Sequence, residues 1–108
     1  MTVYELSQNS QFNVLCLPEP EREISGVYIG DLLSWVMGRA QGDNVWITIM
    51  SNINVIAVAS LSDVSCVLLA EDVTLEENIL KTAIEKGINI LSTPLAAYET
   101  AIKISGMI

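Results

Sequence analysis

The sequence predicts an α/β domain built on a mainly parallel sheet, and the segment from residue 66 to residue 91 carries that prediction. Cys66–Leu69 is a short, wholly apolar run, which is typical of a strand covered on both faces. Residues 89–91 are interpreted as a second buried strand, and the residues between the two have the pattern of an amphipathic helix. Because strands joined through a helix cannot form a hairpin, we expect them to be parallel neighbours in one sheet.

The helix between these strands has boundary signals at both ends. Thr74 and Glu77 have the spacing of a capping box, in which each side chain accepts a hydrogen bond from the backbone amide of the other residue. Gly87 follows Lys86, so a basic last turn and a left-handed residue end the helix. We therefore expect a helix over residues 75–86, with an inner face made of Leu75, Ile79, Leu80, Ala83 and Ile84.

A final helix is predicted to begin at Thr93 and Pro94, because proline is common in the first turn of a helix. Leu95, Tyr98 and Ile102 are expected to form its buried stripe. With this helix, the second half of the chain alternates strand, helix, strand and helix.

The first half of the chain continues the alternation. Asp31 is placed to cap a helix over residues 32–39, which leaves Trp35 away from the apolar side of that helix. The apolar side is expected to consist of Leu32, Leu33, Val36 and Met37. The remaining elements are a short helix over residues 2–7 and strands over residues 13–17, 24–29 and 44–48.

Residues 53–61 fit two structures. Their many β-branched side chains would suit a strand, but the turn after them lacks the glycine that a hairpin usually needs. A helix capped by Ser51 or Asn52 restores the β-α-β alternation and is the preferred interpretation. Such a helix is apolar on every side and so must be covered on every side, which in a small domain indicates a second subunit. The homodimer interface is therefore predicted at Trp35, Ile53, Val55, Ile56 and Val58.

The composition fits one domain of 108 residues and limits its partners. Thirteen acidic and five basic residues give a net charge of −8, which repels nucleic acid and anionic lipid. Residues 45–61 are apolar and uncharged but interrupted by polar side chains, and they fall short of the ~20 residues that a membrane span needs. No secretory signal is recognised at the start of the sequence. We expect a cytoplasmic protein without nucleic-acid or membrane partners.

Catalytic motifs are absent from the sequence. It has no histidine, no GxxxxGK[ST] phosphate loop and no GxGxxG loop, which removes the common nucleophile-activating, acid–base and nucleotide-binding arrangements. Cys16 and Cys66 lie in apolar runs and are interpreted as reduced core residues. We therefore expect no enzymatic activity, no metal and no cofactor.

Five blocks of sequence, at residues 30–34, 45–48, 55–59, 88–93 and 98–101, together resemble a DRTGG domain. The resemblance covers about residues 24–104 of a single domain at residues 1–108. It implies a three-layer α/β/α fold similar to the N-terminal domain of HPr kinase/phosphorylase, with a helix after the Trp46 strand. DRTGG modules also occur in phosphotransacetylases and in CBS-containing pyrophosphatases. The resemblance thus implies a regulatory or dimerising module rather than a catalyst.

The chain departs from this family at the motif that names it. The G-D-R triplet of the family falls on Met50, Ser51 and Asn52, and its T-G-G turn falls on residues 70–72. The lost arginine is a fork for phosphate or carboxylate, and the lost glycines allow backbone amides to approach a ligand. Glu71 and Asp72 would repel an anion there. The departure implies that a phosphorylated ligand is not bound in the way typical of the family.

A small ligand, if one binds, is expected where the parallel strands end. Each position there has two explanations. Glu71 and Asp72 could hold a cation such as Mg²⁺, or they could belong to a solvated loop beside a helix N-terminus. Ser51 and Asn52 could bind an anion, or they could simply cap a helix. The candidate residues are Asp31, Ser51, Asn52, Glu71, Asp72, Ser92 and Thr93.

Three functions follow from these observations. The preferred one is a non-catalytic regulatory module that forms a homodimer and docks onto a partner enzyme or regulatory protein. The second is a nucleotide or metabolite sensor that uses the strand-end loops. The third is phosphoryl transfer, which the kinase resemblance raises and the missing phosphate loop and histidine oppose.

Overall fold

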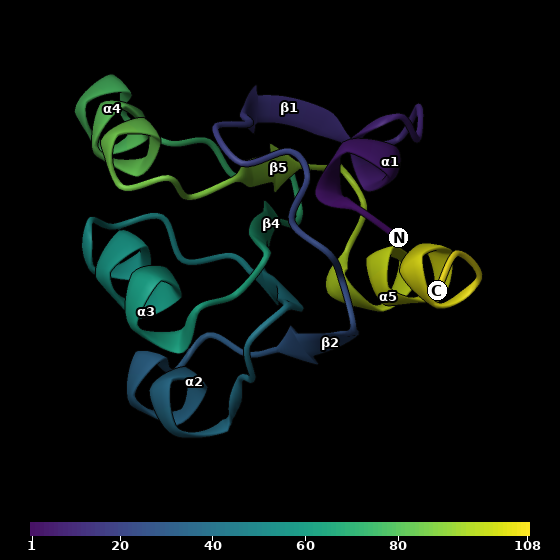
Figure 1. Cartoon of the computed structure of the whole chain (residues 1–108), viewed down its shortest axis with the longest axis horizontal. Helices are drawn as coiled ribbons and strands as arrows, with labels where there is room; N and C mark the ends of the chain where they lie inside the picture. The colour runs from purple at the N-terminus through teal and green to yellow at the C-terminus, as the bar shows by residue number, and fades with distance from the viewer.

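The computed structural model describes residues 1–108 and contains one five-stranded sheet between two layers of helices (Figure 1). The strand order is β1-β5-β4-β3-β2, in which β2 to β5 are parallel and β1 pairs antiparallel with β5. The predicted α/β fold with a mainly parallel sheet is confirmed. The strands are β1 (Asn13–Cys16), β2 (Gly26–Ile29), β3 (Asn44–Thr48), β4 (Cys66–Leu69) and β5 (Ile90–Ser92). The helices are α1 (Val3–Ser7), α2 (Leu33–Arg39), α3 (Asn54–Ser62), α4 (Glu77–Glu85) and α5 (Ala97–Ser105).

The central strands β3 and β4 are buried on both faces, and their alternate side chains enter two separate cores. Trp46 and Leu69 pack under α2, α3 and α4 on one face. Ile47 and Leu68 pack under α1 and α5 on the other face. This double burial explains why β4 and the centre of β3 are continuously apolar in the sequence. Figure 1 shows the three-helix layer on one side of the sheet and both chain termini on the other.

Helix α3 confirms the helical interpretation of residues 53–61, but the chain itself covers one side of this helix. Val55, Ile56 and Val58 are buried against the sheet and the neighbouring helices. The prediction of these three residues at a subunit interface is therefore wrong, because the three-helix layer already supplies their contacts. Ile53 and Trp35 are 47% and 54% exposed, and they remain available for an interface.

The predicted capping box at Thr74 and Glu77 does not form. The N-cap of α4 is Glu76, and its side chain makes no capping bond. Val73 and Leu75 pack partly against the core, which keeps the segment before Glu77 out of the helix. Gly87 ends the helix as predicted, with a left-handed φ of +73°. Within α4, Ile79 and Ala83 are buried, whereas Ile84 is exposed rather than on the inner face.

Helix α5 begins at Ala97, three residues later than predicted. The Leu95 carbonyl accepts a hydrogen bond from the Glu71 amide at 2.8 Å, and this bond ties the backbone at Leu95 to the β4 loop. Tyr98 and Ile102 are consequently exposed, and the buried residues of α5 are Thr100 and Ile104. The predicted stripe of this helix is therefore wrong.

Helix α2 also buries less than predicted. Of its predicted apolar side only Val36 is fully buried and Leu33 is half-buried, while Leu32 and Met37 are exposed. Trp35 points away from the core, as predicted, and the Arg39 guanidinium lies 3.8 Å from the centre of its ring.

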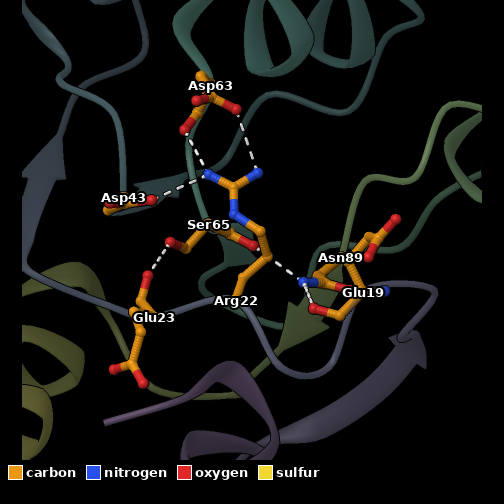
Figure 2. A network of polar contacts seen from close by, with 7 residues as sticks. All are labelled: Glu19, Arg22, Glu23, Asp43, Asp63, Ser65 and Asn89. Carbon is orange, nitrogen blue, oxygen red and sulfur yellow. Dashed lines mark hydrogen bonds and ion pairs between the residues drawn. The ribbon is translucent and has the colours of Figure 1, made fainter.

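The amino ends of the parallel strands are joined by a network of polar side chains (Figure 2). Arg22 forms ion pairs of 3.1 Å with both Asp43 and Asp63, and it also donates to the Asp63 carbonyl at 2.8 Å. The Asn89 side chain is buried and donates to the Glu19 and Ser65 carbonyls at 2.7 and 3.0 Å, while it accepts from the Glu19 amide at 2.8 Å. Asn89 thus ties the loop before β2 to the starts of β4 and β5.

Candidate functional site

The carboxyl ends of β2 to β5 meet at one edge of the sheet, where open parallel sheets usually bind ligands. Asp31 follows β2 at this edge. One of its carboxylate oxygens accepts bonds from the Thr48 hydroxyl at 2.7 Å and the Ile49 amide at 3.0 Å. The prediction that Asp31 caps α2 is therefore wrong, since the N-cap is Leu32 and has no side-chain bond. Asp31 instead fastens the end of β2 to the end of β3.

Glu71 and Asp72 follow β4 and have left-handed φ angles of 57° and 63°. They occupy the positions at which the resemblance places the glycine pair, so the turn keeps a glycine-like backbone without glycine. Their amides donate to the Leu95 carbonyl at 2.8 Å and the Thr93 carbonyl at 2.9 Å. Both amides are thus bonded within the chain, and both side chains point to solvent.

Ser92 and Thr93 end the neighbouring strand β5. Thr93 is fully buried, and its hydroxyl donates to the Gln11 carbonyl at 2.9 Å while accepting from the Leu95 amide at 3.2 Å. Ser92 is also buried. These bonds fasten the β5 loop to the segment before β1, so Thr93 serves the structure of the edge rather than its outer surface.

Ser51 and Asn52 lie between β3 and α3, where they line a pocket of about 490 Å³. The Asn52 side chain accepts from the Asn54 amide at 2.9 Å, although the N-cap position of α3 is Ile53. Neither Ser51 nor Asn52 is therefore the N-cap residue. The pocket is completed by Ile49, Met50, Ile53, Glu76, Asn78 and Ile79.

The structure therefore divides the seven predicted site residues into separate places. Only Ser51 and Asn52 line the pocket at the start of α3. Asp31 contacts the end of β3, whereas Glu71 and Asp72 contact the β5 loop through their backbone. Nowhere in the 108 residues do three Cys, Asp or Glu side chains gather in a way that could hold a metal ion.

The α4 residues of this pocket, Glu76, Asn78 and Ile79, were not predicted from the sequence. A second, smaller pocket of about 210 Å³ lies at the other end of α3, and it was missed as well. Its lining residues are Ala57, Ser60, Leu61 and Lys86. Ile53, Ala57 and Leu61 recur every four residues, and this spacing could have indicated one helix face that links the two pockets.

The two cysteines are unpaired and buried. Burial raises the pKa of the Cys66 thiol to about 12, with a small opposing effect of the Arg22 charge. Burial also raises the pKa of Cys16, whose sulfur donates to the Ile88 carbonyl. Thiolates are the reactive form of cysteine, so neither residue has the properties of a nucleophile.

No helix combines the length and the apolar character that crossing a membrane requires.

Known protein structures include one with a similar fold. One similar solved structure contains the CBS and DRTGG domains of the regulatory region of Clostridium perfringens pyrophosphatase, complexed with the activator diadenosine tetraphosphate. It is 15% identical, covers 85% of this chain and superposes with a TM-score of 0.65, while this chain spans 40% of that one. No curated protein matches the sequence.

The family model described as the DRTGG domain matches residues 5–107, which is nearly the whole chain. The helix that the resemblance implies after the Trp46 strand is present as α3. The chain belongs to the DRTGG domain family.

Proposed function

We propose that the chain is a non-catalytic regulatory module that acts by association, first with a second copy of itself and then with a partner enzyme or regulatory protein. One observation carries the proposal: the chain's own bonds occupy the strand-end edge, where a ligand of the family would be expected. The Glu71 and Asp72 amides donate to carbonyls of the β5 loop, and the Asp31 carboxylate is bonded to β3.

The charge of the chain supports association over anion binding. Glu71 and Asp72 expose carboxylates at the edge, and the net charge is −8. An incoming phosphate would meet a negative potential there, because no arginine or lysine forms an ion pair with Glu71 or Asp72. The absence of histidine and of a phosphate loop argues in the same way against phosphoryl transfer. The two buried, unpaired thiols suit a reducing compartment, so we place the module in the cytoplasm.

A second candidate function is the sensing of a small molecule in the pocket between α3 and α4. The pocket of about 490 Å³ is within the usual size range of ligand sites. Ser51 and Asn52 supply uncharged polar groups there, and Glu76 is its only charged residue. These groups favour a neutral or cationic ligand over a phosphorylated one.

Analytical ultracentrifugation between about 1 and 200 µM tests the proposal, because this range detects dimers with micromolar dissociation constants. A thermal-shift panel with AMP, ATP, diadenosine tetraphosphate and acyl phosphates provides the second arm. A ligand at 100 times its dissociation constant adds ~2.7 kcal/mol to stability, so a binder would raise the melting temperature visibly. We expect a dimer and no shift. If the protein is a monomer and one of these compounds stabilises it, the proposal of association is wrong and the sensing function is supported instead.

A further inference from the structure

The carboxyl ends of α3 and α4 border a third pocket, of about 320 Å³, at the edge of the sheet opposite to the strand-end loops. Its floor is apolar and consists of the buried residues Ala59, Val64 and Ile88. Its wall carries four charged side chains, those of Glu19, Arg22, Asp63 and Lys86. The other two pockets have one charged residue each. The third pocket thus combines an apolar floor with charges of both signs.

Two of the four charges already neutralise each other. Arg22 forms an ion pair of 3.1 Å with Asp63, and it also donates to the Asp63 carbonyl at 2.8 Å (Figure 2). A second ion pair, with Asp43, occupies the same guanidinium. Glu19 and Lys86, in contrast, form no ion pair with each other or with any other residue. One negative and one positive side chain therefore line the pocket without a charged partner.

The unpaired Glu19 is held in place by its backbone. The buried Asn89 side chain accepts from the Glu19 amide at 2.8 Å and donates to the Glu19 carbonyl at 2.7 Å. The Glu19 side chain lies over Gly87, since a Cβ atom at Gly87 would be 3.5 Å from Glu19 Oε1. Gly87 directly follows Lys86, the C-cap residue of α4. Both unpaired charges therefore belong to the same end of α4.

We propose that this pocket binds a free amino acid with an aliphatic side chain. The ammonium group of the amino acid pairs with Glu19, its carboxylate pairs with Lys86, and its side chain covers the apolar floor. The volume lies at the lower end of the range for ligand sites, which suits a molecule of this size. The site does not depend on the proposed self-association, and it would give a regulatory module a signal to respond to.

The charges around the pocket favour a zwitterion over an ion of one sign. An anion such as phosphate would meet Glu19, Asp63 and the negative ends of two helix dipoles. A simple cation would meet Arg22 and Lys86. An amino acid instead offers each unpaired side chain a group of opposite charge. The apolar floor has no partner for a charged side chain, so an aliphatic amino acid fits better than an acidic or basic one.

An amide NMR titration with valine and two of its analogues tests the ligand class. Isobutylamine is valine without the carboxylate, and isovalerate is valine without the ammonium group. We expect valine to bind with a dissociation constant of about 0.1–1 mM. Each analogue should bind at least about tenfold more weakly, because each lacks one charge-assisted hydrogen bond. Equal binding of valine and isobutylamine would identify a plain cation site and overturn the proposal. Silence from alanine, valine, leucine and isoleucine at about 10 mM would overturn it as well.

Removal of each charge tests the two contacts. Lys86→Met should weaken valine binding at least about tenfold and should abolish the preference for valine over isobutylamine. Glu19→Gln should in the same way abolish the preference for valine over isovalerate. Lys81→Met and Glu21→Gln are the matched controls, because both residues are exposed, lie outside the pocket and form no ion pair. They should keep the dissociation constant within about twofold. Controls that weaken binding as much as Lys86→Met and Glu19→Gln would mean that only the net charge matters.

The amides that shift locate the ligand. We expect the largest changes at Ser60, Asp63 and Gly87, whereas changes concentrated at Ser51 and Asn52 would place the amino acid in the other pocket and contradict the proposal. Sedimentation keeps this test separate from the function proposed above. A monomer that binds valine would contradict self-association and support the amino-acid site, and a dimer that binds no amino acid would do the reverse.

Discussion

The two ends of the parallel sheet are held together in different ways. At the carboxyl end, the β4 and β5 loops are joined by backbone bonds of the Glu71 and Asp72 amides, and no ion pair lies there. At the amino end, side chains join segments that are distant in the sequence, with Arg22 bridging two aspartates and Asn89 bridging two loops (Figure 2).

The carboxyl end carries the departures from the family motif, whereas the amino end carries the network of side-chain bonds. At the carboxyl end, Glu71 and Asp72 have left-handed φ angles at the positions where the resemblance places glycines, although glycine suits such angles better. At the amino end the buried Asn89 side chain makes three bonds that water cannot replace. We therefore expect Asn89 to contribute more to stability than the exposed loop residues of the carboxyl end.

The largest expected effect is an alkaline destabilisation from Cys66, the first residue of β4 at the amino end. Its pKa is about 12 in the folded protein against an ordinary 9.0, so only the unfolded chain ionises between these values. The contribution of this thiol to the free energy of unfolding is complete below pH 9 and is lost as the pH rises toward 12. The loss reaches about 4 kcal/mol at 1.36 kcal/mol per pH unit.

Urea unfolding of the wild type and of Cys66→Ala, at several pH values from neutral to strongly alkaline, measures this effect. The wild type should lose more stability with rising pH than the variant. Identical pH dependence in the two proteins would mean that Cys66 is accessible or ionised in the folded state.

Asn89→Ala should lower the free energy of unfolding by about 3 kcal/mol, because it leaves several backbone groups of Glu19 and Ser65 without partners. Asn52→Ala is the matched change at the carboxyl end. Asn52 is exposed and accepts one bond, so its loss should be less than about 1 kcal/mol. Chemical denaturation compares the two, and similar losses would contradict the difference between the two ends.

The smallest effect is expected at the left-handed turn, and its sign is opposite. Glu71→Gly should raise the free energy of unfolding by about 0.5 kcal/mol, because relief of the left-handed strain exceeds the added flexibility of the unfolded chain. Lys81→Gly is the control, since Lys81 is exposed in the interior of α4. It should lower stability by about 0.5–1 kcal/mol. If Glu71→Gly also lowers stability, the left-handed turn is not strained.

Sequence patterns that depend on burial predicted the fold well. The bounds of β3 and β4 match the predicted strands at residues 44–48 and 66–69, whose central residues are apolar because both faces of these strands are covered. Signals that depend on local hydrogen bonds were less reliable. Thr2 and Glu5 form a capping box, whereas Thr74 and Glu77 form none. The bond from the Thr2 amide to the Glu5 carboxylate lowers the pKa of Glu5.

The difference between the two capping sequences comes from their tertiary surroundings. Val73 and Leu75 pack against the core and hold the chain extended where a helix would otherwise begin. The candidate site was predictable only in its location, because the sequence does not show that the chain's own carbonyls occupy the amides of the β4 loop. The sequence predicted an interface on α3 and included the exposed Ile53, but it could not separate Ile53 from the buried Val55, Ile56 and Val58, because apolarity does not show which residues the chain's own core covers.

The burial of both thiols has a practical consequence for experiments on this protein. Cys16 and Cys66 are covered and carry raised pKa values, so alkylating reagents at neutral pH will leave them unmodified while the protein is folded. A cysteine introduced at an exposed position can therefore take a fluorophore or a spin label selectively in the otherwise natural sequence. Distances between two such labels on α3 would report the geometry of the assembly directly in solution.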